Sequence, residues 1–375
     1  MSTTAERRTR LSAVDNLKVI LVAWVIGGHA LLGYSAVGGW PYDEINEVTF
    51  RPGVETALAA LIGPSGLFFM GVFYFMSGLL TPDSVRRKGS LRYSGERLVR
   101  LGIPWAVSAV LAWPLFLWIA YRAAGHEVSP WWVFTHRDPF LDSGSLWFVL
   151  VLLIFSVGYA AFARDHHGTA ELTTKHVVGV TVLVAVTTFL VRLVFPARSG
   201  QVADLHLWWW PQCLAMFALG VAGGRSLAER IPDELYRRSR AVVVATILVL
   251  PVGAALLGVL DLADNAGPFL GGWRWQALLL ASLEGLLVVA GSLWLVGLAQ
   301  RRFTKPVPDA INRGAFAAFV VQGPILVTIA TALRPVPAPA EVKAPLVGAL
   351  AIVVSFAIGA LVTRRKRNAA KVAGR

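Results

Sequence analysis

The stretch VILVAWVIGGHALL, residues 19–32, is almost entirely apolar and contains a single ionisable side chain, His29. Together with the residues from Val14 onward, it reaches the length of about 20 residues that a helix needs to cross the hydrocarbon of a bilayer. The three arginines within the first ten residues also fit the layout of a secretory signal. We favour a first membrane span, because many runs of the same kind follow.

The composition extends this interpretation to the whole chain. Hydrophobic residues make up 56% of the 375 positions and charged residues only 15%, well below the quarter that is typical of soluble domains. Apolar runs of span length predict an all-α integral membrane protein with about ten transmembrane helices. The predicted spans are 14–34, 58–80, 101–121, 144–163, 176–196, 207–226, 241–260, 273–299, 310–333 and 345–363.

Basic residues cluster after the second, sixth, eighth and tenth predicted spans, as the positive-inside rule requires of cytoplasmic segments. The clusters are Arg86, Arg87, Lys88, Arg92, Arg97 and Arg100; Arg225, Arg230, Arg237, Arg238 and Arg240; Arg301, Arg302 and Lys305; and Arg364, Arg365, Lys366 and Arg367. We therefore predict a multi-pass protein of the cell membrane with both termini cytoplasmic. Residues 1–13 would be an N-terminal tail, residues 14–363 a single membrane domain, and residues 364–375 a basic tail.

The net charge of +13 does not indicate a nucleic-acid partner here, because membrane edges account for the basic residues. The lone Cys213 excludes an intramolecular disulfide and a multi-cysteine metal site. The chain has no phosphate loop, no H-E-x-x-H zinc helix and no G-x-S-x-G serine elbow. We expect no metal and no permanently bound cofactor.

An ionisable side chain deep in a bilayer is costly and is by default a functional hypothesis. His29 follows Lys18 by eleven residues, close to three helical turns or about 16 Å, so the two share a helix face. Asp15 lies one turn below Lys18 on that face. Because a histidine accepts and returns a proton near neutral pH, we predict that His29 is a general base. The alternative is a histidine that only packs against a neighbouring helix.

Two further features leave alternatives open. Glu284 lies at the centre of the eighth predicted span, where it would either pair with a structural arginine or support a catalytic histidine. Arg97 and Arg100 present one basic face at the cytoplasmic membrane edge, for lipid contact or for the phosphates of a donor.

The remaining polar and aromatic side chains have simpler explanations. Gln322 in the ninth span is expected to hydrogen-bond a neighbouring helix. The tryptophans at 131–132 and 208–210 fit an interfacial aromatic belt, although aromatic rims also stack on sugars. Six histidines in loops or at span ends are not expected to act; they are His126, His136, His166, His167, His176 and His206.

Several short motifs occur in order along the chain. They are Val14-Asp15-Asn16-Leu17-Lys18 before His29, Phe75-Met76-Ser77-Gly78, Arg97-Leu-Val-Arg100, Ser145-Leu146-Trp147-Phe148, and Trp273-Arg-Trp275-Gln276-Ala277 with Glu284. In this order the chain resembles the acyltransferase-3 family of integral membrane O-acyltransferases. The last motif resembles the branch of that family that includes the glucan biosynthesis protein C group.

The resemblance implies transfer of an acyl group from cytoplasmic acyl-CoA to a hydroxyl of a glycan, a lipid or a small metabolite. His29 would be the catalytic histidine, supported by Glu284, and Arg97 and Arg100 the donor-binding pair. Lys18 would join that pair, but it stands where the family has arginine and lacks the planar fork that grips a phosphate. Gln322 stands where many members have a histidine. Asp15 and Trp147 match supporting positions of the motifs.

These residues suggest that His29 deprotonates the acceptor hydroxyl, which then attacks the thioester of a CoA held at Arg97 and Arg100. An acyl-histidine intermediate is equally consistent with the sequence. A different class of protein also fits, namely a transporter or flippase of a glycan or lipid intermediate in which His29 and Glu284 relay protons.

Overall fold

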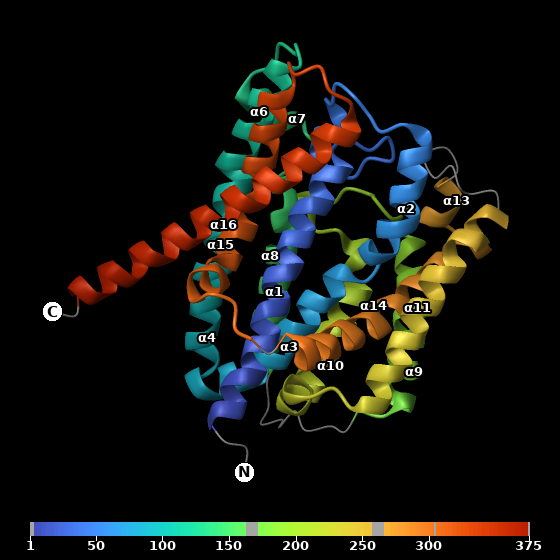
Figure 1. The fold of residues 1–375 in the computed structure, drawn as a ribbon, viewed down its shortest axis with the longest axis vertical. Helices are drawn as coiled ribbons and strands as arrows, with labels where there is room; N and C mark the ends of the chain where they lie inside the picture. The colour runs from blue at the N-terminus through green and yellow to red at the C-terminus, as the bar shows by residue number, and fades with distance from the viewer. Residues whose placement is uncertain (1–3, 163–171, 257–265, 304, 374–375) are drawn as a thin grey trace.

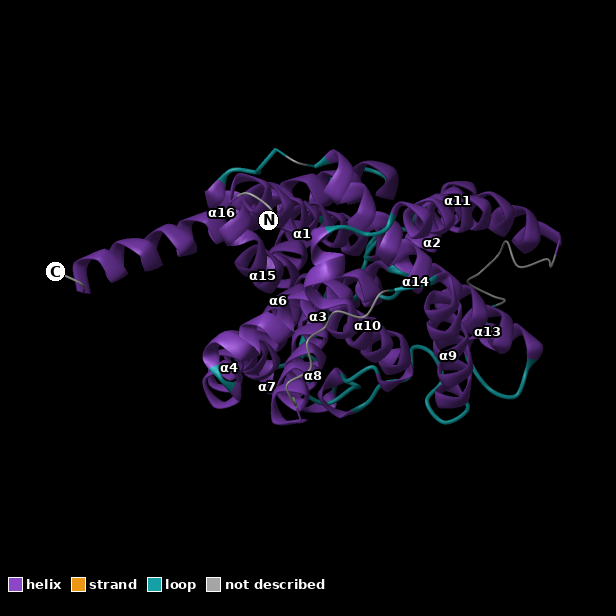
Figure 2. Cartoon of the chain, turned by 90° about the horizontal axis from the view of Figure 1, so that it is seen from below, coloured by secondary structure: helices purple, strands orange, loops and turns teal. Residues whose placement is uncertain are grey.

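The structure is a computed structural model that describes residues 4–162, 172–256, 266–303 and 305–373. Within these ranges every regular element is a helix (Figure 2). Eight segments of the described residues are long and apolar enough to cross a membrane: Ala13–Leu32, Pro52–Lys88, Ser90–Ala123, Gly144–Phe162, Thr174–Arg192, Trp275–Arg302, Asp309–Leu333 and Ala340–Arg364. An all-helical, multi-pass architecture is therefore confirmed.

The helices differ in length, and several segments are built from more than one of them. The α-helices are α1 Thr4–Leu32, α2 Pro52–Gly66, α3 Phe69–Lys88, α4 Ser90–Arg97, α5 Ile103–Val107, α6 Trp113–Ala123, α7 Pro130–His136, α8 Trp147–Phe162, α9 Thr174–Arg192, α10 Trp210–Glu229, α11 Asp233–Leu256, α13 Gly267–Leu270, α14 Trp275–Arg302, α15 Asp309–Leu333 and α16 Ala340–Ala373. Short 3₁₀ turns are η1 Pro41–Glu44, η4 Gly144–Leu146, η5 Val202–Asp204 and η6 Leu207–Trp209, and π-helical turns are η2 Leu98–Gly102 and η3 Ser108–Ala112.

The predicted spans differ from this division in two respects. The span 58–80 falls on two helices, α2 and α3, because the backbone leaves the helical region at Phe68, where φ is −121° and ψ is −12°. The spans 207–226 and 241–260 correspond to α10 and α11, which are not among the eight segments. The second of them also runs beyond the described residues. The count of about ten spans is not confirmed and stays a prediction.

The helices α1 and α16 both continue into the tails that the sequence suggested. α1 begins at Thr4, well before the apolar segment, and α16 extends to Ala373 as a long projection from the rest of the molecule (Figure 1). The limits of the membrane domain at residues 14 and 363 therefore lie inside continuous helices.

The basic segments that follow α3, α10 and α14 lie toward the end of the molecule that carries the start of α1, whereas the basic end of α16 projects sideways (Figure 1). The Asn16 amide donates to the carbonyl oxygens of Phe303 and Lys305, each at 2.7 Å, which holds the connection between α14 and α15 beside α1. Arg301 at the end of α14 in turn pairs with Asp233 at the start of α11. The segments 33–51 and 124–146 lie at the opposite end (Figure 1). The side of the membrane that each end faces stays a prediction.

Glycines let two pairs of helices cross in backbone contact. Gly78 of α3 lies against Gly220 of α10, and Gly314 of α15 lies against Gly359 of α16. A Cβ atom added to Gly314 would lie 2.7 Å from the carbonyl carbon of Gly359, with no flexible side chain to give way. Small residues at such crossings are typical of membrane helices. The α15–α16 crossing fixes the helix that carries Gln322.

Replacing Gly314 by leucine should therefore destabilise the membrane domain. The new side chain must overlap the α16 backbone, and we expect the free energy of unfolding to fall by about 1–3 kcal/mol. Thermal denaturation of the purified protein in detergent measures the effect. Gly179→Leu on α9 is the matched control, since no atom lies within 4 Å of a Cβ at that position. Equal melting temperatures for the two variants would contradict the close crossing.

Candidate functional site

The His29 imidazole lies near the end of α1, far along the helix from Lys18. Its ring stacks on Trp40 from the loop after α1, with the ring centroids 4.2 Å apart and the planes 11° from parallel. Its Nδ1 lies 3.3 Å from the Oε1 of Gln322 on α15. The ring is half-buried, and its Nε2 makes no hydrogen bond to any described residue. The stack and the hydrogen bond together fix the plane of the imidazole.

A small pocket adjoins His29 between α1, α15 and α16. It has room for about one water molecule and is lined by Tyr34, Trp40 and Tyr42 on its loop side. The Tyr34 hydroxyl is buried and has no hydrogen-bond partner among the described residues. The Tyr42 hydroxyl donates to Glu47 at 2.9 Å. Polar atoms thus line the space directly beside the imidazole.

Gln322 links His29 to the turn that opens α8. Its side chain is fully buried in the middle of α15, and its Nε2 donates to the Ser145 hydroxyl at 3.3 Å. Ser145 lies in η4, immediately before Trp147. The sequence predicted a hydrogen bond from Gln322 to a neighbouring helix, and this is confirmed, with His29 as one partner and Ser145 as the other.

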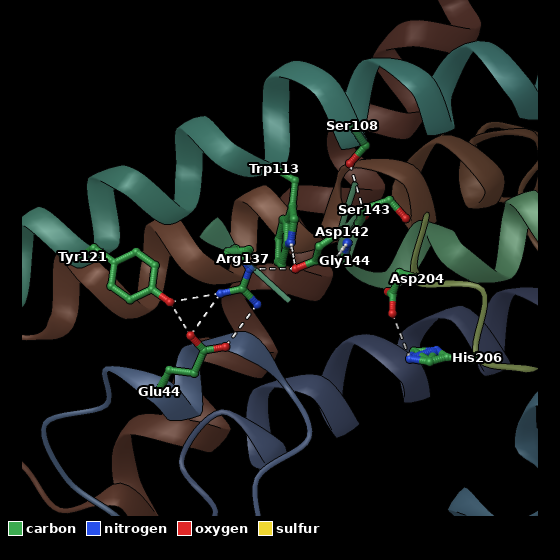
Figure 3. Close-up of polar contacts among 10 residues, drawn as sticks. All are labelled: Glu44, Ser108, Trp113, Tyr121, Arg137, Asp142, Ser143, Gly144, Asp204 and His206. Atoms are coloured by element: carbon green, nitrogen blue, oxygen red, sulfur yellow. Dashed lines mark hydrogen bonds and ion pairs between the residues drawn. The ribbon is translucent and has the colours of Figure 1, made fainter. Parts of the chain in front are cut away.

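The Asp142 carboxylate organises the turn that carries Ser145. Its Oδ1 accepts from the backbone N–H of Gly144 at 2.7 Å, and its Oδ2 accepts from the indole of Trp113 at 2.8 Å (Figure 3). The same Oδ2 accepts from Nε of Arg137 at 3.0 Å. Gly144 adopts a φ of +60°, a conformation that disfavours any side chain. One carboxylate therefore sets the path of the turn from residue 142 to residue 146.

Arg137 joins this turn to the loop that follows α1. Its NH1 and NH2 groups bind the two carboxylate oxygens of Glu44, each at 3.0 Å, and NH1 also donates to the Tyr121 hydroxyl at 3.0 Å (Figure 3). Burial disfavours charge on the guanidinium, but the carboxylates of Asp142 and Glu44 raise the pKa of Arg137 above its usual range. The guanidinium stays charged and connects three segments that are distant in the sequence.

Asp204 and His206 form a titratable pair beside this turn, and the sequence did not indicate it. Nε2 of His206 lies 3.1 Å from Oδ1 of Asp204 (Figure 3). Burial, with a contribution from the Asp142 carboxylate, raises the pKa of Asp204 well above its usual range. Burial also lowers the pKa of His206 to about 4. Both groups are therefore biased toward their neutral forms.

The backbone at this pair is unusual. Asp204 and His206 have φ values of +53° and +48°, and Ala203 and Leu141 also have positive φ. Such conformations cost about 1–3 kcal/mol each in non-glycine residues and concentrate at functional sites. Ala203 donates its N–H to the Phe140 carbonyl at 2.8 Å, so the two strained loops are joined. Aspartate and histidine adopt positive φ more readily than most residues, whereas Ala203 and Leu141 give no such signal in the sequence.

Trp147 and the tryptophans after His206 form a stack. The Trp209 ring lies between Trp147, at 5.3 Å, and Trp208, at 4.6 Å, measured between ring centroids. The edge of His206 meets Trp147 at 4.4 Å. Trp147 and Trp208 are buried, whereas Trp131 and Trp132 on α7 are exposed, as an interfacial position requires. Trp147 thus packs between the turn of Ser145 and the Asp204–His206 pair.

Glu284 pairs with an arginine. The two carboxylate oxygens lie 3.0 Å and 2.8 Å from NH2 of Arg192 on α9, and both side chains are buried. The sequence left open whether Glu284 would pair with an arginine or support His29. The structure shows the arginine pair, and no contact recorded among the described residues joins Glu284 to His29. A catalytic role for Glu284 remains an untested prediction.

The predicted donor-side residues lie toward the other end of the molecule, apart from His29. Lys18 pairs with Asp15 at 3.0 Å, with about a third of the Lys18 side chain exposed. Arg97 donates to the Tyr93 hydroxyl at 3.0 Å. Arg100 lies over the ring of Phe316, 5.3 Å from its centroid, within the π-helical turn η2. None of the three binds His29 or Gln322, so the candidate residues form two groups.

The two groups contain no metal centre. Across the described ranges, no set of three or more histidine, cysteine, aspartate and glutamate side chains is arranged to hold a metal ion. His166 and His167 lie outside these ranges. At His29 the structure places an imidazole with one nitrogen lacking a described partner beside a buried amide and a serine hydroxyl.

Comparison with known proteins shows which family this chain belongs to. Residues 11–364 match the acyltransferase 3 family, which is described as an acyltransferase domain, so the match covers most of the chain. The chain belongs to this family of membrane acyltransferases. No curated protein and no solved structure matches it. The family defines an acyltransferase that uses an acyl donor; it does not identify the acceptor or the base.

Breaking the Arg192–Glu284 pair should destabilise the fold strongly. Glu284→Leu leaves the guanidinium buried and uncompensated, and we expect a loss of about 3–5 kcal/mol in the free energy of unfolding. Adding Arg192→Met removes the second charge and should restore most of this loss. Thermal denaturation measures both variants, and acyl transfer by the double variant separates the two roles of Glu284. A stable but inactive double variant would support a catalytic carboxylate.

The stability of the Asp204→Asn variant relative to the wild type should increase as the pH rises. Because the folded protein holds the Asp204 proton more tightly than the unfolded chain does, the wild-type fold loses stability as the pH rises above 3.8, the ordinary pKa. Asparagine stays neutral, so the melting temperature of the variant minus that of the wild type should increase with pH. Asp309→Asn is the control, since the Asp309 side chain is 79% exposed. Parallel behaviour of the two variants would refute the effect of burial.

Proposed function

We propose that the protein transfers an acyl group from acyl-CoA to a hydroxyl of a glycan, a lipid or a small metabolite, with His29 as the general base. One observation carries this proposal. The His29 ring is held by Trp40 and Gln322, while its Nε2 has no partner among the described residues. A positioned imidazole with a free nitrogen is suited to accept a proton from a hydroxyl.

The transfer follows from the ordinary chemistry of a thioester. Nε2 of His29 takes the hydroxyl proton as the acceptor oxygen attacks the carbonyl carbon. The tetrahedral intermediate then collapses, the carbon–sulfur bond breaks, and the imidazolium returns the proton to the thiolate. The products are an ester and free CoA, and His29 is regenerated. An acyl-histidine intermediate would use the same free nitrogen as a nucleophile.

The donor would bind from the end that carries Arg97, Arg100 and Lys18. Two arginines that approach from one helical surface suit the phosphates of CoA. As whole residues, Arg100 is exposed and Arg97 is half-buried. Lys18 and His29 are about 16 Å apart along α1, a separation that the flexible pantetheine arm of CoA can bridge.

The acceptor would approach from the opposite end of the molecule. His29 lies close to the turns at that end, beside the loop that carries Trp40 and the turn that carries Ser145. The sequence likeness to the glucan biosynthesis protein C group favours a glycan among the three acceptor classes. A proton-relay transporter has less support, because Glu284 is occupied by Arg192 rather than directed at His29.

Acyl transfer should be abolished in His29→Ala. Membranes that contain the wild-type protein are expected to transfer radiolabelled acetyl from acetyl-CoA to cellular acceptors, and the variant should show a loss of at least about 100-fold. Stabilisation of the purified variant by acetyl-CoA in a thermal-shift assay would show that it folds and binds the donor.

Arg97→Gln together with Arg100→Gln is the complementary variant. It should lose the stabilisation by acetyl-CoA while keeping a normal melting temperature in its absence. Wild-type transfer by His29→Ala would end the proposal of a histidine base. A wild-type protein that ignores acetyl-CoA, yet moves protons in proteoliposomes, would favour the transporter.

A further inference from the structure

Gln322 is a fully buried side chain in the middle of a membrane helix, and its two polar atoms face two different partners. Oε1 lies 3.3 Å from Nδ1 of His29, and Nε2 donates to Ser145 at 3.3 Å. A primary amide has one atom that only accepts and one that only donates. With the amide nitrogen directed at Ser145, the oxygen faces His29 and accepts a hydrogen bond from it.

We propose that Gln322, held by Ser145, is the positioning residue that fixes the proton of His29 on Nδ1 and thereby leaves Nε2 as the base. The inference deepens the proposed function and rests on it. A neutral imidazole carries its proton on one nitrogen only. The hydrogen-bond partners of the two ring nitrogens decide which one. The acceptor oxygen of Gln322 selects the tautomer whose free lone pair is on Nε2.

The surroundings of Gln322 make this selection persistent. The Trp40 stack hinders rotation of the His29 ring, so Nδ1 cannot turn away from the amide without losing that contact. On the other side, the Asp142 carboxylate holds the turn that presents Ser145 through the N–H of Gly144. A Cβ atom added to Gly323, the next residue in the chain, would lie 3.0 Å from the Trp113 ring, so α15 is closely packed at this level.

A neutral amide is the appropriate partner for a base inside the membrane domain. A carboxylate at this position would stabilise the imidazolium, and a base that is already protonated cannot accept a proton from a hydroxyl. An amide orients the ring without adding a charge that would be costly in an apolar interior. Glutamine cannot itself take up or release a proton, but as a hydrogen-bond acceptor it can still orient the histidine.

Three substitutions test the inference. Gln322→Met removes the acceptor at nearly constant volume, and we expect kcat to fall by about 10- to 100-fold, as for other residues that orient a reacting imidazole. The KM for acetyl-CoA should not change. Gln322→Glu keeps an acceptor for Nδ1–H, so it should retain activity. The carboxylate favours the imidazolium, so the pH of half-maximal activity should move to a higher value. Ser145→Ala should give a smaller loss than Gln322→Met.

Gln212→Met is the matched control, since Gln212 is also a buried glutamine and its amide nitrogen has no partner among the described residues. It should leave kcat and the pH profile unchanged. Stabilisation by acetyl-CoA confirms that each variant is folded. The ring nitrogen signals of ¹⁵N-histidine-labelled protein, with His29 identified by comparison with His29→Ala, should show the proton on Nδ1 in the wild type.

The outcomes separate this inference from the proposed function. An inactive His29→Ala with a normal Gln322→Met would overturn the role of Gln322 alone. Activity in His29→Ala would overturn the proposed base and the inference together. A wild-type spectrum with the proton on Nε2 would show that the amide is reversed, which also overturns the inference. A loss in Gln322→Met without any shift of the pH profile in Gln322→Glu would indicate a purely structural residue.

Discussion

The hydrogen bond from the Gly144 backbone to the Asp142 carboxylate is the contact on which the geometry around His29 depends. It closes the turn that presents Ser145, and Ser145 is the fixed point to which the Gln322 amide is attached. The same carboxylate binds Arg137, which reaches across to the loop after α1. A single buried charge thus connects the backbone of one loop, the packing of α6 and the orientation of a side chain on α15. Buried hydrogen-bond networks of this kind are effective because an unpaired member would be costly.

The membrane domain accommodates its buried polar groups in two distinct ways. Arg192 and Glu284 pair opposite charges across α9 and α14. His29 and Gln322 instead share one hydrogen bond, and the second ring nitrogen has no partner among the described residues. The first pair holds two helices together, whereas the second leaves a ring nitrogen without a partner among the described residues.

Much of the fold was predictable from the sequence, because apolar runs and basic clusters report on the bilayer directly. The position of most spans and the helical class follow from this. The break at Phe68 was missed although Pro64 and Gly66 just before it are residues that interrupt helices, because the span was predicted from its apolar run alone. At the site, His29 was found because an imidazole is conspicuous within an apolar run. Asp142, Arg137, Asp204 and His206 were not found, because polar residues in loops are ordinary and only the tertiary structure shows that they are buried. The donor-side role of Arg97 and Arg100 rests on the family alone.

The Trp40 indole covers one face of the His29 imidazole and is backed by Trp113, with their ring centroids 5.5 Å apart. An imidazole that can activate a hydroxyl can equally activate water, and a thioester in the same site would then be hydrolysed. The loop after α1 is held down by Arg334, which binds the Ile45 carbonyl, and by Asn46, which binds the Gly33 carbonyl at 3.0 Å. This loop therefore does more than connect two helices. By covering one face of the imidazole, the loop would limit hydrolysis of the donor if His29 is the proposed base.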